Sequence, residues 1–276
     1  MKYENRIVAF IDILGFKDLL DKTTDKDGND QEETIDYILD AYKVIRETWD
    51  LDDKFGMHES MKLAIERENE AKRKVVSIFS DSIVVSFLET AQGEIYWSLS
   101  EIQWMVMNLV NRGILCRGAL SSGKLIHTDK IIFGPALVEA YNTESKAALY
   151  PRIIISRELI ALAGKYGRHP ESQELKYLEN ILKKDGDGMY YIDYFLTTQN
   201  EMDDPNYDFP DYIEKIAAMV KKGSRSLRPD VRIKYMWMRE KVNDVIDQFR
   251  KESVQKEFKK KGYADLALKW AKMKKA

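Results

Sequence analysis

The sequence predicts an α+β protein in which a mixed sheet is covered by helices. Short apolar runs of strand length, bounded by turn-forming residues, recur between residues 6 and 196. Between these runs lie segments whose apolar residues recur at helical spacing, and beyond Asp208 only the helical pattern remains. At 44% hydrophobic residues, the chain can fill a sizeable core.

The first elements follow from where apolar residues, charges and glycines lie. A strand fits an apolar run, a loop fits a segment too charged for a core, and a helix fits an i, i+3, i+4 spacing. We expect, in chain order, a strand over 6–16 that runs into a glycine turn, the start of a helix over 17–20, a charged loop over 21–33, a helix over 34–49 and a charged helix over 57–74. Residues 21–74 thus form a helical insertion.

The later elements follow the same rules, and Pro151 ends the last helix of this part. We expect two strands flanking Asp81, a helix over about 95–111, strands over 114–121 and 131–133, a helix over 135–148, and strands over 152–156 and 189–196. This order is an α+β plan with helices covering one face of the sheet, and a ferredoxin-like core fits it. We expect one catalytic domain over 1–198 and a helical extension over 208–276.

Composition narrows the class of protein. The formal net charge of −2 makes nucleic acid an unlikely partner, and no apolar run approaches the length of a membrane span. Cys116 is the single cysteine, so one chain offers neither a disulfide nor a thiolate zinc site. The three histidines lack zinc-site spacing. These features, with no leader-like start, predict a cytoplasmic protein.

Two aspartates stand in apolar runs of strand character. Asp12 lies within residues 7–16 and Asp81 within residues 75–87. Burying an ionised carboxylate is costly unless a cation or hydrogen bonds replace its water. A divalent cation, Mg²⁺ or Mn²⁺, fits two such carboxylates and keeps open positions for phosphate oxygens, which predicts a nucleoside triphosphate as substrate. The alternative is that each aspartate caps a turn.

Four stretches resemble class III nucleotidyl cyclases, the adenylate and guanylate cyclase family. The runs 10–16 and 79–82 resemble its two metal motifs, 117–123 its next strand, and 133–141 its glycine-led dimer-interface helix. The resemblance covers roughly residues 5–196 and implies a ferredoxin-like class III cyclase core. It also implies a homodimer with active sites at the interface.

The resemblance assigns roles to individual residues. Asp12, Asp81 and the carbonyl of Ile13 would hold two divalent cations, and Asp12 and Asp81 would be catalytic. The substrate's 3′ oxygen would attack its own α-phosphorus, which releases pyrophosphate and leaves a 3′,5′-cyclic nucleotide. The residues implied in phosphate binding are Leu14, Gly15, Phe16, Arg117 and Lys184. For Lys184 the alternative is a solvated hairpin flank, and for Arg117 it is an ordinary ion pair.

Several positions depart from the purine cyclases. Val138 and Asn142 stand where those enzymes carry a ribose-orienting asparagine and a transition-state arginine. Ser77 and Ile131 stand at the base-reading positions, where an adenylate enzyme would carry a lysine and an aspartate. Tyr141 and Asn142 are further candidates for the base pocket, and Tyr42 and Tyr96 are aromatic candidates that either narrow it or belong to the core.

In these departures, and in flanking stretches such as 140–144 and 187–194, the sequence is similar to the Pycsar pyrimidine cyclases of bacterial phage defence. The resemblance implies conversion of UTP first, and CTP second, to a cyclic nucleotide second messenger with a downstream effector. Two alternatives stay open. One is a catalytically silent cyclase-like module that binds a nucleotide, and the other is a purine nucleotide cyclase.

Overall fold

The computed structural model describes residues 1–49 and 74–276. The charged helix expected over 57–74 therefore lies outside the described residues, apart from Lys74. Two compact units make up the chain. Unit 1 comprises Met1–Leu109 and Ile114–Ile192, and unit 2 comprises Val110–Gly113 and Asp193–Ala276.

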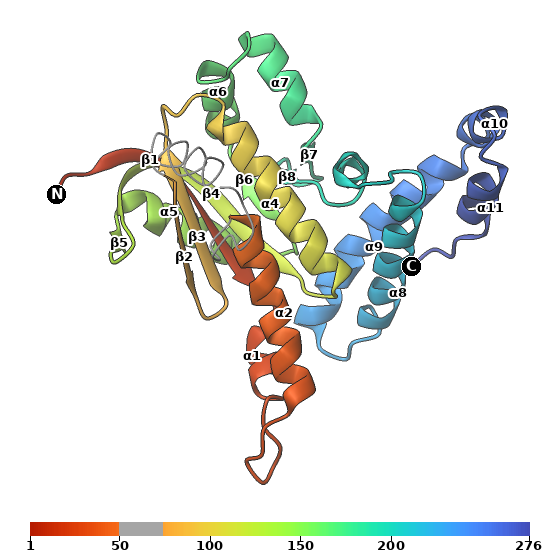
Figure 1. Ribbon diagram of the computed structural model, residues 1–276, viewed down its shortest axis with the longest axis horizontal. Coiled ribbons are helices and arrows are strands. Elements are labelled where there is room, and N and C mark those ends of the chain that lie inside the picture. Colours follow the sequence, from red (N-terminus) through yellow and green to blue (C-terminus); the bar gives the residue numbers. More distant parts are fainter. Residues whose placement is uncertain (50–73) are drawn as a thin grey trace, which may run out of the picture. The chain divides into compact units, whose positions relative to one another are not determined.

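Unit 1 contains a mixed eight-stranded sheet (Figure 1). Its order is β2-β3-β1-β4-β6-β8-β7, and β5 pairs with β4 outside this path. β1 is antiparallel to both β3 and β4, whereas β4 is parallel to β6. The strands are β1 Glu4–Ile13, β2 Val75–Phe79, β3 Ser82–Leu88, β4 Cys116–His127, β5 Ile132–Phe133, β6 Ile153–Ile155, β7 Leu182–Lys184 and β8 Tyr190–Ile192.

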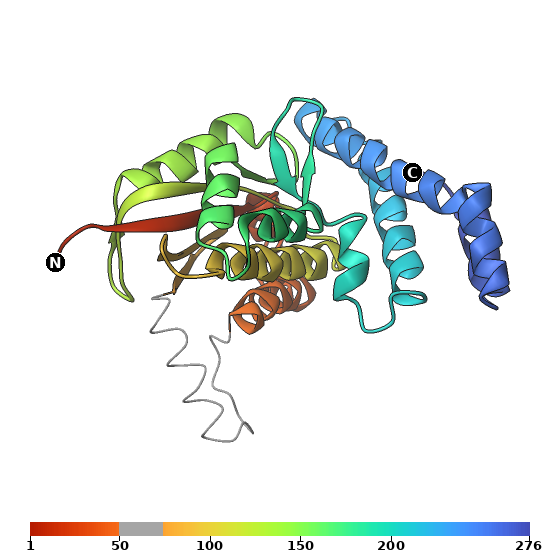
Figure 2. The same ribbon diagram turned by 90° about the horizontal axis from the view of Figure 1, so that it is seen from above.

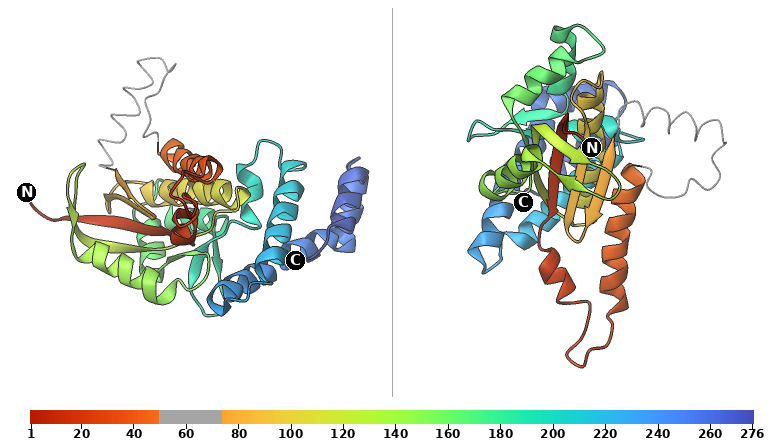
Figure 3. Two further views of the ribbon diagram at one scale, coloured as in Figure 1. Left: turned by 90° about the horizontal axis from the view of Figure 1, so that it is seen from below. Right: turned by 90° about the vertical axis from the view of Figure 1, so that its left-hand side faces the viewer.

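Helices lie on both faces of this sheet. Figure 2 and Figure 3 show α5 on one face and α2 and α4 on the other. The helices of unit 1 are α1 Phe16–Leu20, α2 Glu32–Thr48, α4 Glu94–Asn111, α5 Pro135–Ala147, α6 Arg157–Lys165 and α7 Glu171–Glu179, the last two residues of α4 belonging to unit 2. The α+β fold with a helix-covered mixed sheet is confirmed, but the expectation of helices on one face only is wrong. β1 explains this, because it is buried on both faces and so needs cover on each.

Three elements of unit 1 were not expected from the sequence. α6, α7 and β7 lie between the strand expected over 152–156 and the one expected over 189–196. α6 begins at Ser156, whose hydroxyl accepts a hydrogen bond of 3.3 Å from the amide of Leu159. A serine that caps a helix in this way is the sequence signal that identifies α6. β7 pairs with β8 through Leu182 and Ile192.

Unit 2 is helical, as the pattern beyond Asp208 indicated. Its elements are the 3-10 helix Thr197–Glu201, α8 Asp208–Gly223, α9 Pro229–Arg250, α10 Glu252–Lys260 and α11 Ala264–Lys272. Aromatic rings hold α8, α9 and α11 together, because Phe249 of α9 stacks on Trp270 at 4.3 Å and both pack against Phe209. Across the described ranges, none of the helices is apolar over a stretch long enough for crossing a bilayer.

Candidate active site

Asp12 stands near the end of β1 on the face that α5 covers. Side chains alternate along a strand, so Val8, Phe10 and Asp12 share one face. Val8 and Phe10 pack there with Ala136 and Ala140 of α5 in one apolar cluster. Asp12 follows this cluster at the end of the strand and is half-buried, with 20% of its side chain exposed. The apolar run thus places one carboxylate at the edge of the core.

Asp81 lies in the two-residue turn that joins β2 to β3. Ser80 has a backbone φ of +52°, which residues other than glycine rarely adopt. Two hydrogen bonds to other elements fix this turn. The amide of Ile13 donates to the Asp81 carbonyl at 2.9 Å, and the Tyr42 hydroxyl donates to the Ser80 carbonyl at 2.5 Å. Since Ile13 follows Asp12, the first of these bonds brings the two aspartates to the same place.

Arg117 and Glu144 complete the group of charges around Asp12. Arg117 is the β4 partner of Asp12 in the ladder, and its Nε lies 3.3 Å from Asp12 Oδ2 and 2.6 Å from Glu144 Oε1. Glu144 projects from α5 and is 2% exposed. We call Asp12, Asp81, Glu144 and Arg117 the carboxylate cluster. It holds three acids and one base, and Arg117 is ion-paired with two of the acids.

The pKa of Asp12 reflects this crowding. The pKa of Asp12 rises from 3.8 to about 6, first through burial and then through the nearby charges of Glu144 and Asp81, which together outweigh the lowering effect of Arg117. The carboxylate of Asp12 is thus destabilised in its ionised form. A bound cation would relieve that cost, because its charge favours the carboxylate over the acid.

The donors present fit a cation that arrives with a triphosphate. Mg²⁺ is usually held by one or two carboxylates together with substrate phosphates rather than by an all-protein cage. Asp12 and Asp81 supply two carboxylates, and within residues 1–49 and 74–276 no group of three His, Cys, Asp or Glu side chains forms a preformed metal cage. The assignment of Ile13's carbonyl as a further ligand stays a prediction.

The predicted phosphate site includes the turn after β1. Gly15 has a φ of +76° with open space around its α-carbon, so the turn itself requires glycine here. The amide of Leu14 donates to the carbonyl of Leu115 at 2.8 Å. In this conformation Leu14 is therefore engaged inside the protein, and Gly15 and Phe16 are the predicted amides that remain for phosphate.

Lys184 does not join the carboxylate cluster within one chain. β7, which carries it, is four strands from β1 in the sheet order, about 19 Å at a strand spacing of about 4.8 Å. The Lys184 side chain is too short for that distance. Its predicted role at phosphate requires a second copy of the chain.

The predicted base-pocket residues lie on two elements and in one loop. Ser77 is half-buried on β2, Ile131 is exposed just before β5, and Tyr141 and Asn142 lie on α5. Tyr141 packs edge-on against Phe10 at 5.4 Å between ring centroids, so it lies beside the Asp12 face of β1.

The other two aromatic candidates have structural partners. Tyr42 packs against Phe16 and holds the Ser80 carbonyl, as described above. Tyr96 of α4 packs against Trp97 and Tyr177, away from β1. Tyr42 therefore supports the Asp81 turn, and Tyr96 belongs to the α4–α7 contact.

Two functional candidates were not found from the sequence. Glu144 lies among helix-forming residues and nothing local marks it as buried. A histidine at the end of an apolar strand, such as His127, needs polar partners. The sequence does not identify those partners, because they lie far from His127 along the chain. Its Nε2 lies 2.9 Å from Ser77 Oγ and its Nδ1 lies 2.8 Å from Ser86 Oγ.

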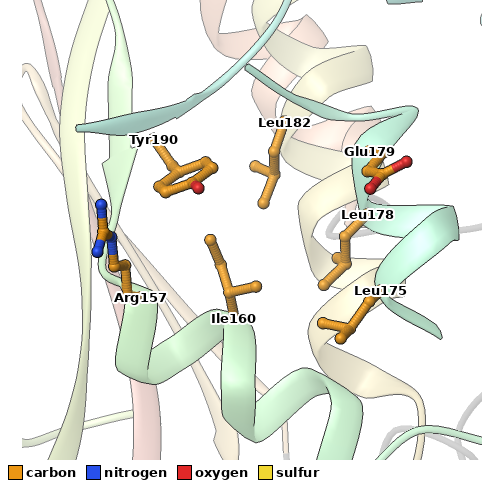
Figure 4. A pocket seen from close by; sticks show the side chains of 7 residues that line it. All are labelled: Arg157, Ile160, Leu175, Leu178, Glu179, Leu182 and Tyr190. Carbon is orange, nitrogen blue, oxygen red and sulfur yellow. The ribbon is translucent and has the colours of Figure 1, made fainter. Parts of the chain in front are cut away.

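A separate cavity of about 260 Å³ lies between α6, α7 and the β7–β8 hairpin (Figure 4). Apolar side chains point into it, with Arg157, Glu179 and Tyr190 among its lining. No residue of the carboxylate cluster lines this cavity, so it is distinct from the candidate site.

Metal binding should depend on pH through Asp12. Its raised pKa means that the metal-free fold binds a proton more tightly than the unfolded chain does, so stability falls as pH rises from about 4 to about 6. Mn²⁺ bound at Asp12 would compete with that proton. We expect the increase in melting temperature caused by Mn²⁺ to be small below pH 6 and to grow as pH rises through about 6. Thermal shift measurements on the wild type and Asp12→Asn test this, and an equal, pH-independent shift in both would contradict it.

Comparisons with known proteins found structural similarity but no sequence family. No family model matches the chain, and no curated protein matches it. Among solved structures it is similar to a bacterial light-regulated adenylyl cyclase, at 13% identity and a TM-score of 0.38, over 58% of this chain and 45% of that one. This chain therefore spans less than half the length of that enzyme.

Two further structures are similar over more of their own length. One is the guanylyl cyclase domain of the RhoGC fusion protein from the aquatic fungus Blastocladiella emersonii, at 13% identity and a TM-score of 0.37, over 70% of this chain and 96% of that one. The other is the guanylyl cyclase Cya2, at 14% identity and a TM-score of 0.37, over 70% and 93%. At this level of similarity, a functional proposal has to rest on the residues of the site.

Proposed function

We propose that the protein is a nucleotidyl cyclase of the class III type that converts a nucleoside triphosphate to a 3′,5′-cyclic nucleotide and pyrophosphate. The observation that carries the proposal is the convergence of Asp12 from β1 and Asp81 from the β2–β3 turn, beside a glycine turn. The motifs that resemble class III cyclases contain these same two residues.

The residues of the chain have distinct tasks in this proposal. Asp12 and Asp81 bind two divalent cations, Mg²⁺ or Mn²⁺, which when bound stabilise charge on the attacking 3′ oxygen and on the departing pyrophosphate. Arg117 holds the Asp12 carboxylate by a charged contact and fixes its direction. The Tyr42 hydroxyl holds the turn that carries Asp81. Gly15 and Phe16 present backbone amides to phosphate.

We propose a homodimer with active sites at the interface as the functional form. Lys184 lies across the sheet from Asp12, so a single copy cannot bring both to one triphosphate. A second copy packed head to tail would supply it. Glu144 lies on α5, the helix that resembles the family's interface helix, and would then stand close to the partner.

A pyrimidine substrate, UTP before CTP, is the finer part of the proposal. Ser77 and Ile131 lack the charges that would read adenine, and Tyr141 stands exposed beside the Asp12 face, where it would narrow the pocket to a single-ring base. The proposed biological role is synthesis of a second messenger in bacterial phage defence, read by a downstream effector.

Incubation of the protein with each of the four nucleoside triphosphates and Mn²⁺ tests the substrate. We expect cyclic UMP to form with the highest kcat/KM, because selection acts through contacts in the closed site. The products are separated by chromatography and identified by mass spectrometry. A preference for ATP or GTP would refute the pyrimidine assignment and leave the cyclase assignment standing.

A silent nucleotide-binding module is the second candidate. It is favoured by Val138 and Asn142, which do not supply the transition-state groups of the purine cyclases, and by the contact of Arg117 with Asp12. Nucleotide that co-purifies with the protein and stays unchanged with Mn²⁺ would support this candidate. Metal-dependent turnover would exclude it.

A further inference from the structure

A chain of polar side chains runs along one face of the sheet and ends at Ser77. Arg6 donates from Nη1 to Glu4 at 2.8 Å and from Nε to Ser86 Oγ at 2.9 Å. Ser86 Oγ lies 2.8 Å from His127 Nδ1, and His127 Nε2 lies 2.9 Å from Ser77 Oγ. Arg6, Ser86 and His127 are all at most 5% exposed, whereas Ser77 is half-buried. Ser77 is therefore the end of the chain that a ligand can reach.

Arg6 determines which group donates in the first hydrogen bond of this chain. A guanidinium group only donates, so Ser86 Oγ accepts from Arg6 and has its own proton left to place. His127 Nδ1 is the other side-chain atom within reach of that hydroxyl among the described residues. The reverse arrangement, with Nδ1 donating, would leave a buried hydroxyl proton without an acceptor, which is costly. Ser86 therefore donates to Nδ1.

The protonation of the His127 imidazole then determines the donor and acceptor roles at Ser77. Burial first, and the charge of Arg6 second, lower the pKa of His127 from 6.5 to about 4, so the ring is neutral at neutral pH. A neutral imidazole that accepts at Nδ1 carries its proton on Nε2. Nε2 thus donates to Ser77 Oγ, which leaves the Ser77 hydroxyl proton available for another acceptor. A serine alone could donate or accept, but here it donates.

We propose that the polar chain from Arg6 through Ser86 and His127 fixes Ser77 as a hydrogen-bond donor to the nucleobase, and so selects uracil over cytosine. The proposal rests on the proposed function, which places the base at Ser77. The two bases differ at ring position 4, where uracil carries a carbonyl acceptor and cytosine an amino donor. We place the Ser77 hydroxyl against this group rather than against ring nitrogen 3, which carries a proton in uracil and would accept the same hydrogen bond in cytosine. His127 and Ser86 are positioning residues in this scheme.

Which ring nitrogen of His127 carries the proton can be measured without an activity assay. The chain has three histidines, so ¹⁵N labelling of histidine and comparison with a His127→Gln variant assigns the His127 ring. We expect ¹⁵N shifts of a protonated Nε2 and an unprotonated Nδ1 at neutral pH in the wild type. A protonated Nδ1 would overturn the proposal, whether or not the protein is a cyclase.

Base selection can be measured by binding alone. The probes are 3′-deoxy-UTP and 3′-deoxy-CTP with Mn²⁺, which lack the attacking hydroxyl and therefore cannot be cyclised, and the readout is the ratio of their Kd values by calorimetry. We expect the wild type to bind the uracil probe about tenfold more tightly, since one neutral hydrogen bond distinguishes the two. Ser77→Ala and Ser86→Ala should reduce this ratio toward one, and Ser77→Thr, which keeps the hydroxyl, should retain it.

Ser122→Ala is the matched control, because Ser122 lies on β4 in the same sheet but is exposed and outside the polar chain. It should keep the wild-type ratio. A wild-type preference for the cytosine probe, or an unchanged ratio in Ser77→Ala, would overturn the inference. If the uracil probe is preferred as expected but UTP itself is never cyclised, the base contact stands and the cyclase proposal fails.

Discussion

Replacement of Asp12 or Asp81 by Asn should abolish formation of cyclic nucleotide while the protein stays folded. Each change removes a cation ligand at the point where the triphosphate also needs the cation. Loss of several kcal/mol of transition-state stabilisation corresponds to a decrease in kcat of about a thousandfold or more, at about 1.4 kcal/mol for each factor of ten. The measurement is the initial rate of cyclic product formation with Mn²⁺.

The stability of Asp12→Asn provides an independent check of the same site. Because burial raises the pKa of Asp12, its ionised form weakens the metal-free fold at neutral pH. The variant should therefore melt a few degrees higher than the wild type without metal. Asp36→Asn is a matched control, because Asp36 is an exposed aspartate of α2 outside the site, and it should change neither the rate nor the melting temperature. Unfolding of Asp12→Asn, with activity retained per folded molecule, would show that the carboxylate is structural.

Replacement of Arg117 by Met should have the largest effect on stability among the residues of the site. Glu144 is 2% exposed and its charge faces Arg117 Nε at 2.6 Å. Removing one partner of a buried pair leaves an uncompensated charge, so we expect a decrease of about 3 kcal/mol in the free energy of unfolding. Urea denaturation of unliganded protein measures it.

The double variant Arg117→Met/Glu144→Gln should recover much of that loss, because it removes the stranded charge together with its partner. Arg232→Met is the matched control at an exposed arginine and should lie within about 0.5 kcal/mol of the wild type. If Arg117→Met is as stable as the wild type but binds triphosphate weakly, Arg117 serves the substrate rather than Asp12.

The central strands and the aspartate pair were accessible from the sequence because their signals are local. β1, β2 and β3 are apolar runs, and each aspartate stands out within its run as a charge where none is expected. Their meeting was inferred from the resemblance to a family and appears in the structure as the bond from Ile13 to the Asp81 carbonyl.

The rest of the site depends on contacts between residues far apart in the chain. Glu144 acquires its role only because α5 packs across β1 and β4, and no feature of its own helix reveals that. His127 likewise matters through Ser77 and Ser86, which are 50 and 41 residues away. α6 and α7 are short helices of nine residues each, so their apolar spacing gives only a weak local signal, and the N-cap Ser156 is the clearest sequence feature of α6.

The most direct test of the cyclase proposal is whether wild-type protein, UTP and Mn²⁺ yield cyclic UMP and pyrophosphate in equal amounts. The reaction is run with and without an extract of phage-infected bacteria as a source of activator, and Asp81→Asn is run beside it. We expect equimolar cyclic UMP and pyrophosphate from the wild type and neither product from the variant. UTP that remains unchanged in every reaction, or that yields UDP and phosphate, would contradict the account.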